Sequence, residues 1–450
     1  MSVHICESAI FGTSWGTVEV RQMFDETRRV KDWLAILSIL AQTQSDHELI
    51  PREAADQIQE ACSRIAVDEE FLKEVERGFC ASNHSLIGFI RAVQSRCGRQ
   101  GGEWLCYGAT VQDITDTQLM WTLTRLQKHL LNELELVKEI LIGMVVRYRG
   151  VYMLGRTHGQ IGLPITFGYK AACWLDEIMR HLERLAEIES RVSVGQLCGG
   201  VGSLSSLGPT ALQIQSDFMH RLDLKAPSIS WTNTRDRLAE WMNLLALIAS
   251  TGDRIGHEIY NLQRPEIAEL NEGFVEGTIG SITMPQKRNP EISEHLGTLA
   301  RVVRHDSSHM LESLVHDHER DGRSWKGEWW IVPPACLTTA KIVSLLRRLL
   351  GELQINEQRM LDNIHSADGF IFAESVMLSL ASKMGKQSAH MLVYSIAEDA
   401  RSSGLDFESA VKGDRRIHQH LSLEEVNGLF DLKRSVGHCD AMIDQVLERA

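Results

Sequence analysis

A short segment near residue 280 combines a flexible backbone with three reactive or polar side chains. Residues 273–290 contain three glycines, which ease bending, and two prolines, which exclude a helix interior. The same segment carries Ser281, Lys287 and Asn289. A mobile loop with a hydroxyl, an ammonium and an amide suits an anionic substrate that must lose a proton. A solvated surface loop is the alternative, and we predict an active-site lid.

A histidine in the segment Gly-Arg-Thr-His-Gly-Gln, residues 155–160, is a second candidate. The segment lies between two helical patterns, so we expect a loop or a helix start. His158 is suited to proton exchange near neutral pH. A lone histidine is more often structural, and the residues by themselves leave both roles open.

The segment 108–117, Gly-Ala-Thr-Val-Gln-Asp-Ile-Thr-Asp-Thr, precedes a long apolar periodicity. Hydroxyls and backbone N–H groups at the start of that helix could hold a carboxylate, aided by the helix dipole. The alternative is a plain helix N-cap made by Thr115 or Asp116. The two roles are compatible.

A charged and aromatic run follows at residues 316–329. His316 and His318 with an acid between them resemble metal ligands, but no third ligand or metal-binding spacing accompanies them, so we predict no metal. Arg320 is a better candidate for an anion contact, because a guanidinium matches a carboxylate bidentately. Solvated helix faces are the alternative.

Four further polar positions are weaker candidates for substrate contacts. Asn233, Arg235 and Arg237 stand in Trp-Thr-Asn-Thr-Arg-Asp-Arg and resemble Arg320 in chemistry. His84, in Ser-Asn-His-Ser-Leu, is either a second active-site histidine or a helix cap.

Composition excludes several classes of protein. The chain has 450 residues, 43% of them hydrophobic, which allows two or three domains with a sizeable core. Its net charge of −13 argues against a nucleic-acid binder. The nine cysteines are scattered and form no C-x-x-C pair, as in reduced thiols. With no secretory signal and no apolar stretch of bilayer length, we expect a cytoplasmic protein that meets no membrane.

Helical periodicity dominates the chain and predicts an all-α fold. Leucines and a valine recur every three or four residues from Leu119 to Leu141, which predicts a helix over 118–145 of about 40 Å. Similar seams cover 175–188 and 342–349. Long helices with narrow apolar seams pack as bundles, and unmatched seams predict subunit contacts. We divide the chain into an N-terminal helical domain (1–111), a central helical bundle (112–355) and a C-terminal helical domain (356–450).

The segment around Ser281 resembles the motif G-S-S-x-M-P-x-K-x-N-P of the fumarase/aspartase superfamily. The matching positions are Gly280, Ser281, Met284, Pro285, Lys287, Asn289 and Pro290. Ile282 stands where the motif has its second serine. The resemblance implies that Ser281 is the proton-abstracting base.

Two other segments carry the same resemblance. Residues 157–160 are similar to the superfamily's T-H-x-Q region, which implies that His158 assists catalysis, often as general acid, with Thr157 and Gln160 beside the substrate. Residues 108–117 are similar to G-x-T-S-x-D-x-x-D-T. Val111 replaces the serine that helps to bind substrate carboxylate, so Thr110 and Gln112 must do more of that work.

The resemblance covers nearly the whole chain and implies a reaction and an assembly. It implies a homotetramer around a central helical bundle, with active sites shared between three subunits. The reaction implied is anti β-elimination from a succinyl-type substrate, releasing fumarate without metal or cofactor. Ser281 would remove the Cβ proton, Lys287, Asn289 and Thr110 would stabilise the carbanion, and His158 would protonate the leaving atom.

Within the superfamily the sequence resembles two branches. Residues 318–329 and 369–377 are similar to 3-carboxy-cis,cis-muconate cycloisomerase, whereas His158 and His84 are similar to adenylosuccinate lyase. The segments that grip a nucleotide phosphate in the second branch are absent. We predict a carbon–nitrogen or carbon–oxygen lyase acting on a small substituted succinate or aspartate. Cycloisomerase and adenylosuccinate lyase itself remain alternatives, and an inert structural homologue is the alternative from another class.

Overall fold

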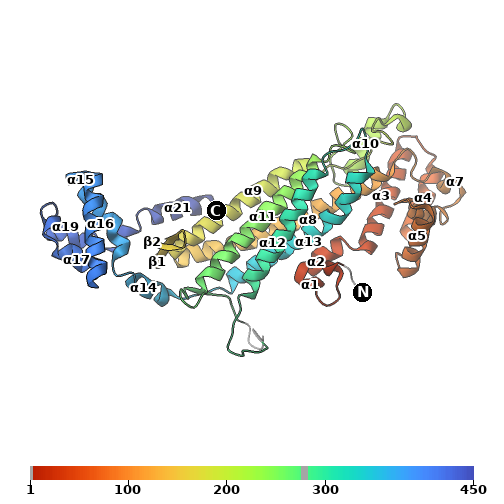
Figure 1. Cartoon of the computed structure of the whole chain (residues 1–450). Coiled ribbons are helices and arrows are strands. Elements are labelled where there is room, and N and C mark those ends of the chain that lie inside the picture. Colours follow the sequence, from red (N-terminus) through yellow and green to blue (C-terminus); the bar gives the residue numbers. More distant parts are fainter. Residues whose placement is uncertain (1–3, 275–281) are drawn as a thin grey trace. The chain divides into compact units, whose positions relative to one another are not determined.

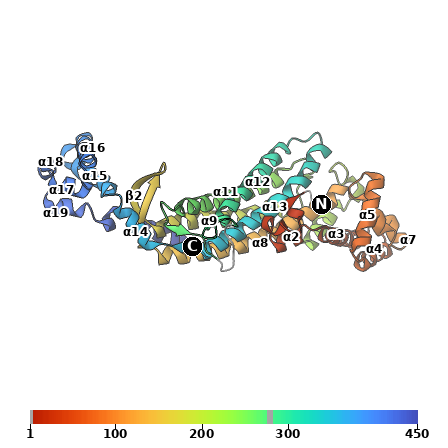
Figure 2. The same ribbon diagram turned by 60° about the horizontal axis from the view of Figure 1, so that its bottom comes forward.

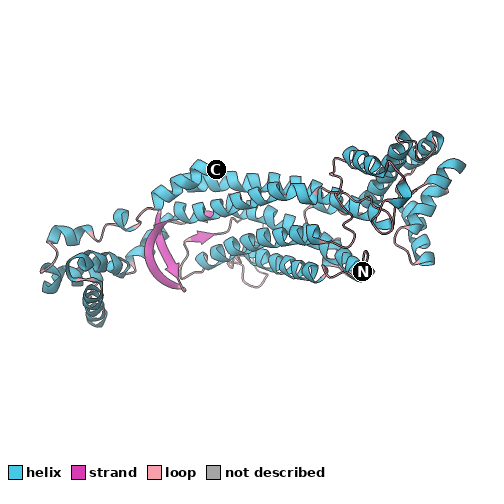
Figure 3. Cartoon of the chain, turned by 90° about the horizontal axis from the view of Figure 1, so that it is seen from above, coloured by secondary structure: helices cyan, strands magenta, loops and turns pink. Residues whose placement is uncertain are grey.

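The fold of the chain is helical, as the apolar periodicity predicts. The computed structural model describes residues 4–274 and 282–450, and helices account for most of them (Figure 3). The chain forms two compact units. The first unit comprises residues 1–133, 181–252 and 298–344, and the second comprises 134–180, 253–297 and 345–450. The predicted division into three consecutive domains stays a prediction.

Five long helices, all labelled in Figure 1, have residue ranges that extend over both units. They are α8 (Val111–Arg147), α9 (Phe167–Val192), α11 (Asp236–Leu262), α12 (Glu291–Glu312) and α13 (Gly322–Gly351).

The remaining elements belong to one unit each. The first unit contains η1 (Ile5–Glu7), α1 (Gly12–Trp15), α2 (Val18–Met23), α3 (Glu26–Asp46), α4 (Arg52–Arg64), α5 (Glu69–Ser82), α6 (Ile87–Gln94), α7 (Arg99–Trp104), η2 (Ser205–Leu207) and α10 (Ala211–Arg221). The second unit contains β1 (Tyr152–Thr157), β2 (Gln160–Thr166), β3 (Leu270–Asn271), β4 (Gln354–Ile355), α14 (Glu357–His365), η3 (Phe370–Phe372), α15 (Ala373–Met384), α16 (Lys386–Ser403), α17 (Phe407–Gly413), α18 (Arg415–His418), α19 (Leu423–Gly428), α20 (Leu432–Ser435) and α21 (Cys439–Arg449).

The apolar seams predicted for the long helices are buried. In α8 the seam from Leu123 to Leu141 is fully buried, and only its first member, Leu119, is half-buried. The helix starts at Val111, seven residues before the predicted start. The polar segment is helical because the Asp113 carboxylate accepts the N–H of Thr110, one half of a capping box. Thr115 and Asp116 therefore lie inside α8, and the alternative that one of them caps the helix is wrong.

Side-chain hydrogen bonds join segments of the long helices within the first unit. Thr124 on α8 is 3.0 Å from Ser193 at the end of α9, Oγ to Oγ. His181 on α9 meets the hydroxyl of Thr251 on α11 at 2.7 Å. The indole N–H of Trp241 on α11 points to the sulfur of Cys336 on α13. These bonds satisfy polar groups that would otherwise be buried without partners.

A β-hairpin, β1–β2, occupies residues 152–166 of the second unit, where we expected a loop or a helix start (Figure 2). Thr157 pairs with Gln160, so His158 and Gly159 form a two-residue turn. Both turn residues have positive φ, +52° and +74°, as a type I′ hairpin turn requires. Glycine accepts this conformation freely, and that local preference selects a hairpin over a helix.

The end of the second unit is a group of shorter helices, as the sequence predicts for residues after 356. Asn356 caps α14 by accepting the N–H of Arg359, and Gly404 ends α16 in the left-handed conformation. A separate core of Val376, Leu380 and Phe407 holds α15 to α17 together.

One described helix, α13, is long and apolar enough to span a bilayer by length and composition alone. Two-thirds of its most apolar window, 67%, is buried inside the structure, which favours a core helix.

A buried carboxyl on α12 predicts a pH-dependent stability. One carboxylate oxygen of Asp306 has no hydrogen-bond partner among the described residues, and burial raises the pKa of this carboxyl from 3.8 to about 6. Because this pKa is higher in the folded protein than in the unfolded chain, the carboxyl contributes to the free energy of unfolding below about pH 4. That contribution is lost as the pH rises through about 6. We expect Asp306→Asn to gain roughly 1 kcal/mol of stability at pH 7.5, after allowance for solvent screening, and nothing near pH 4.

Thermal melts from pH 4 to pH 8 test this expectation. The matched control is Asp223→Asn, because the Asp223 side chain is 90% exposed and should show no pH-dependent difference. A lower melting temperature of Asp306→Asn than of the unmodified protein at pH 7.5 would contradict the assignment.

Candidate active site

Thr110 and Arg320 meet at the N-terminus of α8. Both terminal nitrogens of the Arg320 guanidinium donate to the Thr110 hydroxyl, each at 3.0 Å. These two predicted substrate contacts are 210 residues apart in the chain, and the fold of the first unit brings them together. A guanidinium, a hydroxyl and a helix N-terminus form a setting that favours a carboxylate.

A buried carboxylate fixes the position of Thr110. Asp113 accepts backbone N–H groups from Thr110 at 2.8 Å, from Cys198 at 2.8 Å and from Gly199 at 3.0 Å. Burial raises the pKa of Asp113 to about 6, even though the three donors favour the charged form. The Thr110 N–H is therefore occupied, and a ligand would meet its hydroxyl instead.

The loop that carries Arg320 is fastened by two side chains from the segment before α11. Thr232 donates its hydroxyl to the carbonyl of Glu319 at 2.8 Å, and Asn233 donates its amide to the carbonyl of His318 at 2.5 Å. Asn233, predicted as an anion contact, thus bonds to the backbone next to Arg320. Within the described residues, no three His, Cys, Asp or Glu side chains gather into a group that could hold a metal.

Arg235 lies fully buried between two carboxylates. Its guanidinium donates to Asp116 at 2.8 and 3.1 Å and to Glu328 at 2.6 and 2.8 Å, and it stacks 4.8 Å from the Trp231 ring. Burial lowers the pKa of Arg235, but the two carboxylates outweigh it and the net shift is upward. This geometry favours a supporting role for Arg235, and its predicted contact with substrate stays a prediction.

Two other candidates of the first unit have hydrogen-bond partners within that unit. Gln112 is buried, and its amide donates to the carbonyl of Thr232 at 3.4 Å. His84 is half-buried, and its Nδ1 accepts the N–H of Leu86 just before α6. Leu86 is the N-cap residue of α6 and the helix has no side-chain cap hydrogen bond, so the bond from Leu86 to His84 is not a helix cap.

His158 lies at the exposed tip of the β1–β2 hairpin, flanked by the exposed Thr157 and Gln160. Two residues earlier, Arg156 forms a bidentate pair with the fully buried Glu269 at 2.7 and 2.9 Å. Asn363 on α14 donates to the same carboxylate at 2.8 Å. Glu269 and Asn363 thus anchor the strand that presents His158.

The two ends of the predicted lid are tied to each other in the second unit. Glu272, just before the lid, accepts the N–H groups of Ile292 and Ser293 at 3.0 and 2.7 Å and so caps the start of α12. Ser281, the predicted base, lies outside the described residues. Lys287 is exposed and Asn289 is half-buried, and the neighbouring Ile282 is 99% exposed.

Sequence reasoning did not find three supporting carboxylates. Asp113 stands inside a segment that the sequence singled out, but its three backbone partners include a loop 85 residues away. Glu269 and Glu272 stand in a stretch without any recognisable pattern, Ala-Glu-Leu-Asn-Glu-Gly. Their partners are distant in sequence, so only a three-dimensional structure reveals them.

The buried pair of Arg156 and Glu269 predicts a large effect of one substitution. Glu269→Gln removes the charge that balances a guanidinium in a largely buried position, and we expect a loss of about 3 kcal/mol of stability. Thermal melts check this, with Glu398→Gln as the matched control. The Glu398–Arg401 pair is exposed, so the control should lose less than about 1 kcal/mol. Equal melting temperatures for the two variants would contradict the anchoring role of Glu269.

Comparisons with known proteins give a consistent picture. A family profile described as Lyase matches residues 13–304, and one described as Adenylosuccinate lyase C-terminus matches residues 369–446. The N-acetyl-S-(2-succino)cysteine lyase of Enterococcus italicus is 36% identical over 447 residues, covering 99% of this chain and 97% of that protein.

Solved structures resemble the chain over its whole length. The fumarate lyase from Mesorhizobium sp. BNC1 has a TM-score of 0.90 at 30% identity, covering 98% of this chain and 100% of that one. The β-carboxy-cis,cis-muconate cycloisomerase from Acinetobacter calcoaceticus sp. ADP1 has a TM-score of 0.89 at 26% identity, with the same coverage. The profile matches and the full-length relatives establish that the chain belongs to the Lyase family, on the adenylosuccinate lyase-like branch of the fumarase/aspartase superfamily.

Proposed function

We propose that the chain is a lyase that releases fumarate from a 2-substituted succinate by anti β-elimination. The observation that carries this proposal is the Thr110–Arg320 pair at the start of α8, a ready site for one carboxylate of a succinyl group. The name of the Enterococcus relative describes a thioether of succinate. The bond cleaved in this chain's substrate therefore belongs to the class of carbon–nitrogen, carbon–oxygen or carbon–sulfur bonds.

The lid would supply the base and the charge that stabilises the carbanion. Ser281 takes the proton from the carbon next to a carboxylate, and the electron pair moves into that carboxylate as an aci-carboxylate. Lys287 and Asn289 then stabilise the developing charge, which falls again when the leaving group departs and fumarate forms. Closing the lid excludes water and strengthens these contacts.

His158 would act on the opposite side of the reaction. Its exposed position at the hairpin tip makes the ring accessible to a partner, and Arg156 is tied to Glu269 in the strand below it. A histidine near neutral pH can donate the proton that the leaving nitrogen, oxygen or sulfur requires. We propose this general-acid role, directly or through one water.

The proposal includes an oligomeric state and a cellular compartment. We propose a homotetramer whose active sites combine residues of different subunits, in the cytoplasm, acting on a small dicarboxylate without metal or cofactor. Exposed apolar side chains such as Val146 and Leu247 on the long helices are available for subunit contacts.

A cycloisomerase is the second candidate, supported by the close structural likeness to the Acinetobacter enzyme. Adenylosuccinate lyase proper is supported by the profile match at residues 369–446. We favour a smaller succinyl substrate because the relative with 36% identity is a lyase of that kind.

Removing the Ser281 hydroxyl tests the proposed reaction. We expect the unmodified protein to release fumarate from N-acetyl-S-(2-succino)cysteine or a related adduct, and Ser281→Ala to lose about 10³-fold in kcat because the proposed base is removed. Fumarate absorbance measures turnover, and light scattering checks that the assembly is unchanged.

Thr283→Ala is the matched control, because it removes a neighbouring hydroxyl of the same segment and should retain most activity. Turnover of a carboxymuconate alone would favour the cycloisomerase. An inert homologue would release fumarate from no substrate, and full activity of Ser281→Ala would overturn the role of that residue.

Arg320→Lys tests the carboxylate site. A lysine keeps the charge but cannot offer two parallel N–H donors, so we expect KM to rise about tenfold for every succinyl substrate. Steady-state kinetics measure it. Arg323→Lys, three residues further on and paired with Asp321, should leave KM unchanged. The same KM in both variants would show that Arg320 does not bind the substrate carboxylate.

A further inference from the structure

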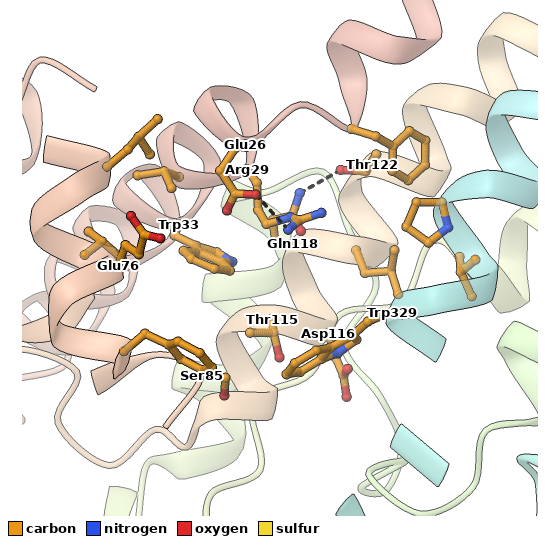
Figure 4. Close-up of a pocket in the computed structure, with 18 of the residues that line it drawn as sticks. Glu26, Arg29, Trp33, Glu76, Ser85, Thr115, Asp116, Gln118, Thr122 and Trp329 are labelled. Atoms are coloured by element: carbon orange, nitrogen blue, oxygen red, sulfur yellow. Dashed lines mark hydrogen bonds and ion pairs between the residues drawn. The ribbon is translucent and has the colours of Figure 1, made fainter. Parts of the chain in front are cut away.

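A cavity of about 540 Å³ lies in the first unit, walled by α3, α5, the start of α8 and the start of α13. Aromatic rings form much of its surface, among them Trp33, Phe79, Trp325 and Trp329. Figure 4 shows Trp33, Trp329, Thr115 and Ser85 around the same space. Its volume falls in the range of pockets that take ligands of drug size.

Three residues of the cavity wall lie close along the chain to candidate residues of the active site. Ser85 directly follows His84 in the chain, and Thr115 lies on α8 five residues after Thr110, about 7.5 Å along the helix axis. Trp325 stands in the first turn of α13, five residues after Arg320. This placement is compatible with a substrate whose succinyl carboxylate is held by Thr110 and Arg320 and whose remainder enters the cavity.

The charges that line the cavity disfavour a phosphate. Its carboxylates outnumber its two cations, Arg29 and Lys73, and each cation already has a carboxylate partner. Arg29 is 3.3 Å from Glu26, and Lys73 is 2.6 Å from Glu69. Within the described part of the chain, no cation of this cavity lacks an acidic partner, so a phosphate would meet more repulsion than attraction.

One polar group of the cavity wall has no partner. The indole N–H of Trp33 makes no hydrogen bond within the described residues, although the side chain is only 9% exposed. Figure 4 shows the indole nitrogen turned toward the cavity. A buried donor without an acceptor is costly, so an acceptor supplied by a ligand would gain the full value of the bond.

We propose that this cavity holds the leaving group of the substrate and selects an apolar or aromatic group that carries an uncharged acceptor, such as an amide carbonyl, and no phosphate. The proposal rests on the proposed fumarate-releasing reaction. Trp329 and Trp325, whose rings meet edge to face at 4.8 Å, provide the aromatic wall. Trp33 donates to the acceptor.

Three substrates test the preference for an aromatic group, for an uncharged acceptor and against a phosphate. S-(2-succino)-N-benzoylcysteamine is uncharged beyond its succinyl group and carries a ring and an amide carbonyl. N-acetyl-S-(2-succino)cysteine is smaller and anionic, and adenylosuccinate carries a phosphate. We expect kcat/KM to fall in that order. Calorimetric binding to Ser281→Ala measures the same preference without turnover, so a failure of the proposed reaction is distinguished from a failure of the cavity assignment.

Matched tryptophan variants test which side chains of the cavity wall contact the leaving group. Trp329→Ala should weaken binding of the benzoyl compound about fivefold, whereas Trp330→Ala, at an exposed neighbour outside the cavity, should not change it. Trp33→Phe keeps a ring but removes the donor, and it should also weaken binding about fivefold. The proposal is overturned if adenylosuccinate binds as tightly as the benzoyl compound, if the benzoyl compound does not bind, or if the Trp329 and Trp330 variants behave alike.

Discussion

The first unit depends on one buried carboxylate. Asp113 gathers three backbone N–H groups, one from the residue before α8 and two from the loop at Cys198 and Gly199. Backbone donors cannot be altered by side-chain substitution, so the geometry depends on a single residue. By holding Thr110 at the helix start, Asp113 determines where the Arg320 guanidinium finds its acceptor. The cost of burial is visible in the raised pKa of Asp113, which is about 6.

Buried ion pairs serve the same purpose elsewhere in the two units. Arg235 is balanced by Asp116 and Glu328 in the first unit, and Arg156 is balanced by Glu269 in the second. Such pairs add little net stability over apolar packing, because desolvation offsets their attraction. Their value lies in defined geometry: a bidentate pair permits one orientation of the guanidinium, and therefore one position of the chain that carries it.

The sequence predicted the elements that depend on local pattern. The leucine seam of α8 and the helical fold were predictable because burial of an apolar face repeats every three or four residues. Thr110 and Arg320 were singled out by their chemistry, but their contact was not predictable, since no local pattern links residues 210 positions apart. The β1–β2 hairpin was missed because its glycines obscure the strand pattern, and Glu269 was missed because it has no pattern of its own.

Glu269 has a consequence for how this enzyme can change over generations. The residue that anchors the hairpin is followed directly by β3, and three residues later Glu272 joins the two ends of the predicted lid by accepting the N–H groups of Ile292 and Ser293. Substitutions in the hairpin and in the predicted lid can therefore affect each other, because the carboxylates that hold both segments are three residues apart. Laboratory evolution of new activity should therefore diversify both segments in a single library. A change in one segment alone would disturb the contacts that hold the other.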